Sequence, residues 1–395
     1  MASRNVDTVV VGLGAMGSAA AYQLAKRGAR VVGLDRYAPP HTHGSTHGET
    51  RITRQAIGEG EEYSPFAIRS HEIWREIEAA TGADLLTLTG GLIISSSAAG
   101  AVVHVADFLA TTIAAARRYG VAHEVLDAAE IRRRFPAFRV QDQETGYYEP
   151  GAGFVRPERC VAAQLELARR HGATLHLGAE VVEIRRDGDG VLVRTPSESY
   201  RADQAVLSAG PWLPALLPPE YARLFAITRQ VLYWFAASDP IERFDPARFP
   251  VFIWEPAGLP EGIYGFPAID GASGGLKVAP AAYGDRLTTA DAPRRPVTEA
   301  EIAATYRDLV APCISGLGPT CLRTATCLYT VTSNSGFVID RHPELPRVVL
   351  VSPCSGHGFK HSAAIGEAVA EWVTEGRSRL DLKPFGLSRL GEVQA

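Results

Sequence analysis

The stretch VDTVVVGLGAMGSAAAYQLAKRGARVVGLD, residues 6–35, decides the fold. It consists of an apolar run, a glycine turn, an alanine-rich segment, a glycine stop and a second apolar run. This order predicts a strand, a helix and a second strand parallel to the first. The glycines fall at Gly12, Gly14 and Gly17, which is the G-x-G-x-x-G spacing of dinucleotide-binding turns.

Each glycine in this turn has a physical reason. Gly12 permits the tight turn, Gly14 lets backbone approach a pyrophosphate, and Gly17 lets the helix pack closely on the strand. The helix N-terminus would face the phosphates with unpaired N–H groups and the positive end of its dipole. Asp35 ends the second strand, where a carboxylate can accept both hydroxyls of an adenosine ribose and would repel a 2′-phosphate. The stretch therefore predicts a site for FAD or NAD and disfavours NADP, but it does not decide between FAD and NAD.

Composition limits the class of protein. A chain of 395 residues with 46% hydrophobic and 21% charged residues fits a globular enzyme of two domains, or of one domain with an insertion. The net charge of −4 gives no electrostatic case for nucleic acid or an anionic membrane. The chain lacks an apolar run long enough to cross a bilayer, and its start lacks a signal-peptide core. Because the five cysteines are odd in number and unevenly placed, we expect a reduced, cytoplasmic protein.

Residues 36–63 are rich in Pro, Gly, Thr and His and predict a long loop. Its histidines, together with Glu49, suggest a metal site, but Arg51 and Arg54 lie beside them and would oppose a bound cation. A solvated polar loop is a second interpretation. We favour a third, a loop folded over the cofactor, and expect no metal.

The rest of the chain alternates between two patterns. Helices are predicted over 66–81, 103–119, 127–135, 160–170 and 298–314, and the segment 225–283 predicts an antiparallel sheet. Residues 347–376 repeat the opening theme of strand, glycine turn and helix. We therefore expect an α/β protein whose nucleotide-binding domain is discontinuous, with a second domain inserted.

Two stretches in the last quarter carry reactive groups. Cys327 and Tyr329 lie on one face of a predicted strand, where the thiol could also be an ordinary buried cysteine. The turn 355–360 places a glycine backbone and Lys360 at a helix start, which is typical of an anion site.

Together these motifs resemble one family. The glycine turn with Asp35, HTHGSTHGETR at 41–51, YGFP at 264–267, GLK at 275–277, CLYT at 327–330 and GHGFK at 356–360 are similar to the monomeric sarcosine oxidase and N-methyltryptophan oxidase family, within the larger D-amino-acid-oxidase-like group. The similarity spans nearly the whole chain, in the family's order. It implies FAD rather than NAD and a small amino-acid substrate oxidised with O₂. It also implies a Rossmann-like FAD-binding domain formed by 1–85, 150–222 and 322–395, and a substrate domain formed by 86–149 and 223–321.

The resemblance assigns roles to individual residues. Cys327 matches the cysteine that carries FAD through the flavin 8α-methyl; a free buried cysteine is the alternative. Lys277 matches the lysine near flavin N5 that helps O₂ accept electrons, or is an exposed lysine after a turn. Arg54 and Lys360 match the pair that holds the substrate carboxylate; ion pairing with nearby glutamates, Glu49, Glu59 or Glu61, is the alternative.

Further residues line the flavin and the substrate in the family. His47 and Arg51 match residues on the flavin's other side, where positive charge favours the anionic reduced ring. Tyr264 and Tyr329 match tyrosines of the substrate pocket. The helix dipole behind the turn 357–359 should raise the flavin potential. The positions expected around the cofactor are Gly12, Gly14, Met16, Gly17, Asp35, Ser45, Thr46, Arg51, Cys327, Gly356, Gly358, Phe359 and Lys360.

Two departures from the family bear on the substrate. Ala281, after Pro280, stands where a sarcosine oxidase typically has histidine. Residues 334–336 are Asn-Ser-Gly, where the family often has an acidic pair and a histidine. Both changes are expected to remove polar pocket material and to favour a larger or more apolar amino acid than sarcosine.

The prediction is an FAD oxidase of N-methyl, N-alkyl or cyclic secondary amino acids that forms an imine and H₂O₂, working as a monomer. One alternative is a flavin-dependent dehydrogenase with an acceptor other than O₂, and another is an oxidase of a bulky primary amino acid. An NAD-dependent dehydrogenase and a catalytically silent flavin-binding protein are the remaining alternatives.

Overall fold

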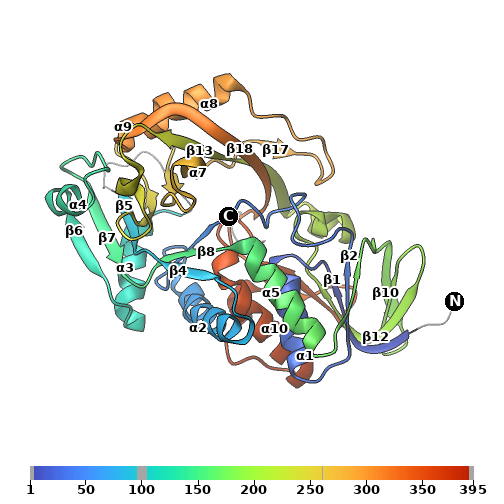
Figure 1. The fold of residues 1–395 in the computed structure, drawn as a ribbon. Coiled ribbons are helices and arrows are strands. Elements are labelled where there is room, and N and C mark those ends of the chain that lie inside the picture. The colour runs from blue at the N-terminus through green and yellow to red at the C-terminus, as the bar shows by residue number, and fades with distance from the viewer. Residues whose placement is uncertain (1–3, 96–104, 260, 391–395) are drawn as a thin grey trace.

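The computed structural model describes residues 4–95, 105–259 and 261–390. Its strands form an eight-stranded sheet, a nine-stranded sheet and a small three-stranded sheet. In Figure 1 the main helices gather in the lower half of the view, and the long strands of the second sheet run across the top.

The eight-stranded sheet is built on the N-terminal strand. β1 (Arg4–Val11) pairs in parallel with β2 (Val31–Asp35) and β12 (Ser199–Leu207), and buried valines of β1 fix its place in the core. The other members are β9 (Thr174–Leu177), β10 (Glu183–Asp187), β11 (Gly190–Arg194), β19 (Val338–Arg341) and β20 (Val348–Ser352). Because β20 runs parallel to β12, both ends of the chain share one sheet.

Four helices pack together beside this sheet: α1 (Ala15–Lys26), α2 (Ser64–Thr81), α5 (Pro157–Arg170) and α10 (Ser362–Glu375). α1 contacts both α5 and α10, and α10 also contacts α2. Residues 362–371 of α10 are all buried. Most of these residues are apolar or small, as expected when neighbours cover more than one face of a helix, and the two buried glutamates, Glu367 and Glu371, pair with Arg69 and Arg27.

The nine-stranded sheet forms the second half. It contains β5 (Gly91–Ser95), β6 (Glu124–Asp127), β7 (Thr145–Glu149), β13 (Phe225–Ala237), β14 (Val251–Trp254), β15 (Ile263–Gly265), β16 (Leu276–Pro280), β17 (Arg286–Leu287) and β18 (Leu317–Thr332). All its pairs are antiparallel except β5 with β14. The three-stranded sheet consists of β3 (Arg51–Thr53), β4 (Leu86–Leu88) and β8 (Gly153–Val155). Its strands occur where the chain passes from one large sheet to the other.

Smaller helices complete the fold. They are α3 (Phe108–Tyr119), α4 (Ala128–Arg134), α6 (Pro219–Ala222), α7 (Gly271–Gly274), α8 (Glu299–Thr305) and α9 (Ala311–Cys313). A π-helical segment, Tyr306–Val310, joins α8 to α9, and 3-10 turns are present at Glu61–Tyr63, Gly210–Leu216, Ile241–Phe244, Phe359–His361, Lys383–Phe385 and Leu387–Leu390.

The predicted α/β class with a substrate sheet is confirmed, and four details differ from expectation. The helix predicted over 103–119 begins at Phe108, and positions 103 and 104 lie outside the described residues. The helix predicted over 298–314 is divided by the π-helical segment. The loop 36–63 includes β3 and a 3-10 turn. The second sheet has one parallel pair, because β5 and β14 come from different inserted segments and are joined by a long crossover rather than by a hairpin.

Strand pairing also bears on the predicted domain boundaries. β18 pairs with β13 from Leu317 to Thr332, so residues 322–332 lie in the nine-stranded sheet although they were assigned to the FAD-binding domain. Its long antiparallel partner β13 places β18 in the nine-stranded sheet. The full division into two domains stays a prediction.

Candidate functional site

The β1–α1 turn has the tight backbone that its glycines predicted. Gly12 has a φ of 84°, in the left-handed region. A Cβ on Gly17 would lie 1.7 Å from the Gly12 carbonyl oxygen, whereas one on Gly14 would meet only Thr46 Oγ1, at 3.7 Å. Leu13 N–H donates to Asp35 Oδ2 at 2.7 Å, which ties the turn to the end of β2. Gly17 therefore serves packing, while Gly14 faces open space.

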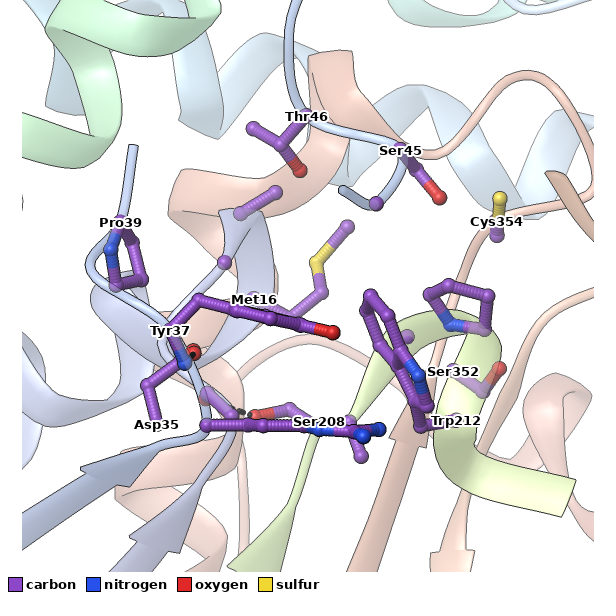
Figure 2. A pocket seen from close by; sticks show the side chains of 18 of the residues that line it. Met16, Asp35, Tyr37, Pro39, Ser45, Thr46, Ser208, Trp212, Ser352 and Cys354 are labelled. Atoms are coloured by element: carbon purple, nitrogen blue, oxygen red, sulfur yellow. Dashed lines mark hydrogen bonds between the residues drawn. The ribbon is translucent and has the colours of Figure 1, made fainter. Parts of the chain in front are cut away.

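A cavity of about 300 Å³ begins at this turn. We call it the nucleotide cavity, and Figure 2 shows part of its wall. Eleven of the predicted residues are on that wall: Gly12, Gly14, Met16, Asp35, Ser45, Thr46, Arg51, Tyr329, Gly356, Gly358 and Phe359. They come from β1–α1, the loop after β2, the end of β18 and the turn before α10.

The wall of the nucleotide cavity fits a dinucleotide. The open space at Gly14 is where a side chain would fill the cavity and where a phosphate could approach backbone. Ser45 Oγ and Ser352 Oγ are buried on the wall, and neither has a hydrogen-bond partner within the described part of the chain. Buried hydroxyls without partners are rare, so they fit a bound polar group.

A second cavity, which we call the inner cavity, lies beyond the first. It has a volume of about 70 Å³ and shares Arg51, Tyr329, Gly356 and Phe359 with the nucleotide cavity. The predicted residues Arg54, Tyr264, Lys277 and Lys360 also line it. Tyr264 and Lys277 come from the adjacent strands β15 and β16, whereas Arg54 and Lys360 belong to segments far from them in sequence, so the fold assembles this site from both halves of the chain.

Arg54 and Lys360, the two cations predicted to hold the substrate carboxylate, are bridged by Glu59 in the inner cavity. Arg54 Nη2 donates to Glu59 Oε2 at 2.6 Å, and Lys360 Nζ lies 3.4 Å from Glu59 Oε1. All three residues are buried. Burial lowers the pKa of Lys360 to about 8, with Glu59 acting against the shift. The alternative of ion pairing is thus present in the structure, yet two cations and one carboxylate leave a net charge of +1.

Lys277 occupies another part of the same cavity. Its Nζ donates to the carbonyl oxygens of Gly48 and Thr50, each at 2.8 Å, and lies 3.8 Å from the centroid of the Phe266 ring. Burial first, and then the charge of Arg51, lower the pKa of Lys277 well below its ordinary value. Lys277 is buried, so the alternative of an exposed lysine is excluded.

Comparison with known proteins identifies the kind of enzyme. A family model described as FAD dependent oxidoreductase matches residues 7–372. The chain belongs to this family. It is 41% identical over 397 residues to the monomeric sarcosine oxidase of Streptomyces avermitilis, with 100% of each chain covered. It is 34% identical over 389 residues to the N-methyl-L-tryptophan oxidase of Escherichia coli, covering 97% of this chain and 99% of the relative.

A solved structure shares the fold of this FAD-dependent oxidoreductase. NikD, described as an unusual amino acid oxidase essential for nikkomycin biosynthesis, superposes with a TM-score of 0.80 at 26% identity, covering 97% of this chain and 98% of that one. The resemblance to the monomeric sarcosine oxidase and N-methyltryptophan oxidase family is confirmed, and with it FAD rather than NAD as cofactor.

His47 lines neither cavity. Burial, followed by the charge of Arg51, lowers its pKa to about 3, so this environment disfavours the positive charge that the family match assigned to it. Its role at the flavin stays a prediction. Arg51 lines both cavities, and its Nη2 donates to the carbonyls of Ser45 and His47.

Cys327 lies close to the cavities but on the wall of neither. Its thiol is buried, and burial raises its pKa while the charges of Arg51 and Lys277 act to lower it. Cys354, which the sequence did not single out, lines the nucleotide cavity and accepts a hydrogen bond from Thr330 N–H at 3.3 Å. Figure 2 shows its side chain at that wall.

The inner cavity also has a tyrosine that sequence reasoning missed. Tyr264 and Tyr329 have their hydroxyl oxygens 3.2 Å apart, and the ring of Tyr283 lies 6.0 Å from that of Tyr329. The sequence contained a signal for Tyr283. Side chains at every second position of an extended chain point to the same side, and Lys277, Ala281 and Tyr283 are an even number of residues apart along and beyond β16. Ala281 lines the cavity as expected, whereas residues 334–336 line neither cavity, so only one of the two departures alters the pocket.

The described residues also bear on two other kinds of feature, a metal site and a membrane span. These residues contain no cluster of three or more His, Cys, Asp or Glu side chains placed to hold a metal ion. In the same part of the chain, no helix is both long enough and apolar enough to cross a membrane.

Proposed function

We propose that this enzyme oxidises the C–N bond of N-methyl, N-alkyl or cyclic secondary amino acids, with O₂ as the electron acceptor. One observation carries the proposal: the inner cavity has Arg54 and Lys360 on its wall and shares Arg51, Tyr329, Gly356 and Phe359 with the nucleotide cavity. A substrate held by its carboxylate would therefore lie next to the cofactor's reactive end. The relatives named as sarcosine and N-methyl-L-tryptophan oxidases support the same substrate class.

Charge explains how the carboxylate could bind. Arg54 and Lys360 with Glu59 carry a net charge of +1 when Lys360 is protonated. One substrate carboxylate would neutralise it, and two cations from separate elements would fix its orientation. The close hydroxyls of Tyr264 and Tyr329 would then wall the ligand.

When bound, FAD supplies the two-electron oxidation of the C–N bond. The substrate loses two electrons and two protons and becomes an imine, O₂ takes them to form H₂O₂, and water hydrolyses the imine to an amine and an aldehyde or keto product. The chain's part is to orient the substrate and to stabilise charge. Burial lowers the pKa of Lys277, and the carbonyls of Gly48 and Thr50 that accept from its Nζ stabilise the protonated form. In that form Lys277 would favour electron transfer to O₂, because the ammonium stabilises the negative charge that develops. A neutral bound amine would need no strong general base, so no residue is assigned that role.

The shape of the inner cavity favours a substrate larger than sarcosine. Ala281 takes the place of a histidine, and the neighbouring wall is apolar, with Ile52, Leu232 and Ile253. An apolar wall without the imidazole would accept an N-alkyl or ring substituent. An oxidase of a bulky primary amino acid is the alternative that the same wall permits.

Three further properties form part of the proposal. Cys327 carries FAD as a thioether, which the match of CLYT at 327–330 to the family supports. The enzyme works as a monomer, as the names of its relatives suggest. It acts in the cytoplasm, where the five unevenly placed cysteines would stay reduced.

The test is a peroxide-coupled screen of the purified holoenzyme. Sarcosine, N-methyltryptophan, pipecolate, proline and primary amino acids of both hands would be compared by kcat/KM. We expect secondary amino acids with an apolar substituent to be preferred. Reduction of the flavin by these compounds without rapid reoxidation in air would point instead to a dehydrogenase with another acceptor. Absence of any flavin reduction would indicate a silent flavin-binding protein.

A further inference from the structure

The turn Gly48–Thr50 lies between two charged side chains from different halves of the fold. On one side, the carbonyl oxygens of Gly48 and Thr50 accept from Lys277 Nζ, each at 2.8 Å. On the other side, the N–H groups of Gly48 and Glu49 both donate to Glu158 Oε1, at 2.6 and 3.1 Å. A single carboxylate oxygen therefore holds the turn that holds the lysine.

The backbone of this turn is unusual. Gly48 has a φ of 98° and Glu49 a φ of 71°, so two consecutive residues are in the left-handed region. For Glu49, which has a side chain, this conformation is strained and persists only where the surroundings impose it. The paired N–H groups point to Glu158 as that constraint, since hydrogen bonds to a carboxylate are stronger than those to a neutral acceptor.

Glu158 is well placed to act as a fixed support. It lies in the first turn of α5, and α5 packs against α1 in the core beside the eight-stranded sheet (Figure 1). Lys277 is on β16 in the other sheet, where Trp234 is its antiparallel partner on β13. Glu158 contacts the turn, and the turn contacts Lys277, so these contacts connect a helix of the core to the inner cavity. The reaction as proposed above assigns no role to Glu158.

We propose that Glu158 is a positioning residue for the oxygen-dependent half of the reaction: it fixes the turn Gly48–Thr50 so that its two carbonyls hold Lys277 in the inner cavity. This inference rests on the proposed function, because it takes O₂ as the acceptor and Lys277 as the group that promotes its reduction. The charge of Glu158 also favours the protonated form of Lys277, which burial opposes. Glu158 itself touches neither cavity.

The variants Glu158→Gln and Glu158→Ala test the role. Reoxidation of the anaerobically reduced holoenzyme by O₂ would be followed by stopped flow, beside its anaerobic reduction by the best substrate. We expect reoxidation to slow by about tenfold in Glu158→Ala and less in Glu158→Gln, because the amide oxygen can still accept a hydrogen bond. The rate of reduction should stay within about twofold of wild type. Glu166→Gln is the matched control, since Glu166 is exposed on the same helix and pairs with Arg170.

A second measurement does not depend on turnover. Hydrogen–deuterium exchange of a peptide spanning the turn should show faster exchange of the Gly48 and Glu49 amides in both Glu158 variants, with or without flavin. Unchanged exchange, unchanged reoxidation or equal loss of both half-reactions would overturn the inference. If Glu158→Ala fails to fold, the exchange and reoxidation measurements on Glu158→Gln test the inference by the same criteria. A wild-type holoenzyme that is reduced by substrate but reoxidised slowly would refute the proposed oxidase function instead, and the exchange data would still report on the turn.

Discussion

Cys327 and Cys354 are two thiols at the flavin end of the nucleotide cavity, and they differ in environment. Cys327 is buried in β18 under the influence of Arg51 and Lys277, while Cys354 is on the cavity wall itself. Nearby cations favour the thiolate, which is the nucleophile that attaches to an electrophilic flavin. The cations only oppose the burial that raises the pKa of the Cys327 thiol, so the proposed attachment at Cys327 rests on the match of CLYT at 327–330 to the family, although Cys354 is on the open wall.

Acid denaturation separates the two cysteines. In the wild type, we expect the yellow colour to precipitate with the polypeptide, and in Cys327→Ala to stay in the supernatant. Cys354→Ala is the control and should retain bound colour. The reverse pattern, with colour lost only in Cys354→Ala, would move the thioether to Cys354.

Lys360 gives the site a pH dependence. Its pKa is lowered to about 8, and the other charged or titratable groups around it are Glu59, Arg54, His357 and His361. A bound carboxylate stabilises the ammonium and raises that pKa. Affinity for a carboxylate should therefore be constant below about pH 8 and fall by about tenfold per pH unit above it, until the pKa of the bound form is reached.

Titration of flavin absorbance with propionate between pH 6.5 and 10 would measure this dependence. Lys360→Met should bind propionate more weakly throughout, and its affinity should no longer fall above pH 8. His361 does not confuse the result, because burial keeps its pKa well below the ordinary value and the ring stays neutral over this range. An equally steep fall in Lys360→Met would show that another group titrates.

At the scale of elements, two glycines of the β1–α1 turn that belong to one sequence motif, Gly14 and Gly17, serve different functions. A Cβ at position 17 would lie 1.7 Å from a carbonyl oxygen, and one at position 14 would have space. The first position concerns the packing of helix on strand, and the second concerns the volume left for phosphate.

Gly17→Ala and Gly14→Val should therefore fail in different ways. Gly17→Ala should lower the free energy of unfolding of the apoprotein by about 3 kcal/mol, because backbone must shift to admit the methyl group. Gly14→Val should leave the thermal midpoint of the apoprotein within a few degrees of wild type and abolish FAD binding. Thermal unfolding and the flavin content after reconstitution measure the two effects. Normal flavin content in Gly14→Val would contradict the assignment of Gly14 to the phosphates.

At the scale of the molecule, the nucleotide cavity is bounded by both halves of the chain. Asp291, which follows β17, accepts from Trp212 Nε1 at 2.9 Å and from Arg36 Nη1 at 2.9 Å. Arg36 follows β2, and all three residues line the cavity. The inserted half thus makes contact with the nucleotide-binding half at the end of the cavity where Asp35 lies.

Loss of this contact should weaken retention of FAD. In the Cys327→Ala background, Asp291→Ala should raise the dissociation constant of FAD by about tenfold, which corresponds to about 1.4 kcal/mol. Ultrafiltration with fluorescence of the released flavin would measure it. Glu299→Ala, an exposed change in the same inserted segment, is the control and should have no effect. An unchanged dissociation constant would show that the Asp291 contacts do not contribute to FAD binding.

The sequence by itself determined the parts whose signal is local. The glycine spacing with Asp35 predicted the β1–α1–β2 unit, and the order of short motifs predicted the family and the cofactor. Turns and amphipathic segments can be predicted in this way because their residues act on neighbours a few positions away. The resemblance to the family assigned Arg54, Tyr264, Lys277, Tyr329 and Lys360 to one site, and all five line the inner cavity.

Only the tertiary structure decided how those residues meet. Glu59 bridges Arg54 and Lys360, Glu158 supports the turn beneath Lys277, and burial lowers the pKa of His47. The sequence offered Glu59 only as one of three possible ion-pair partners. The other two results could not be obtained from spacing, because Glu158 and Lys277 are far apart in sequence and the pKa of His47 depends on burial. Ionisation follows the dielectric and the charges that the complete fold places around a group, and those exist only after the two sheets have packed.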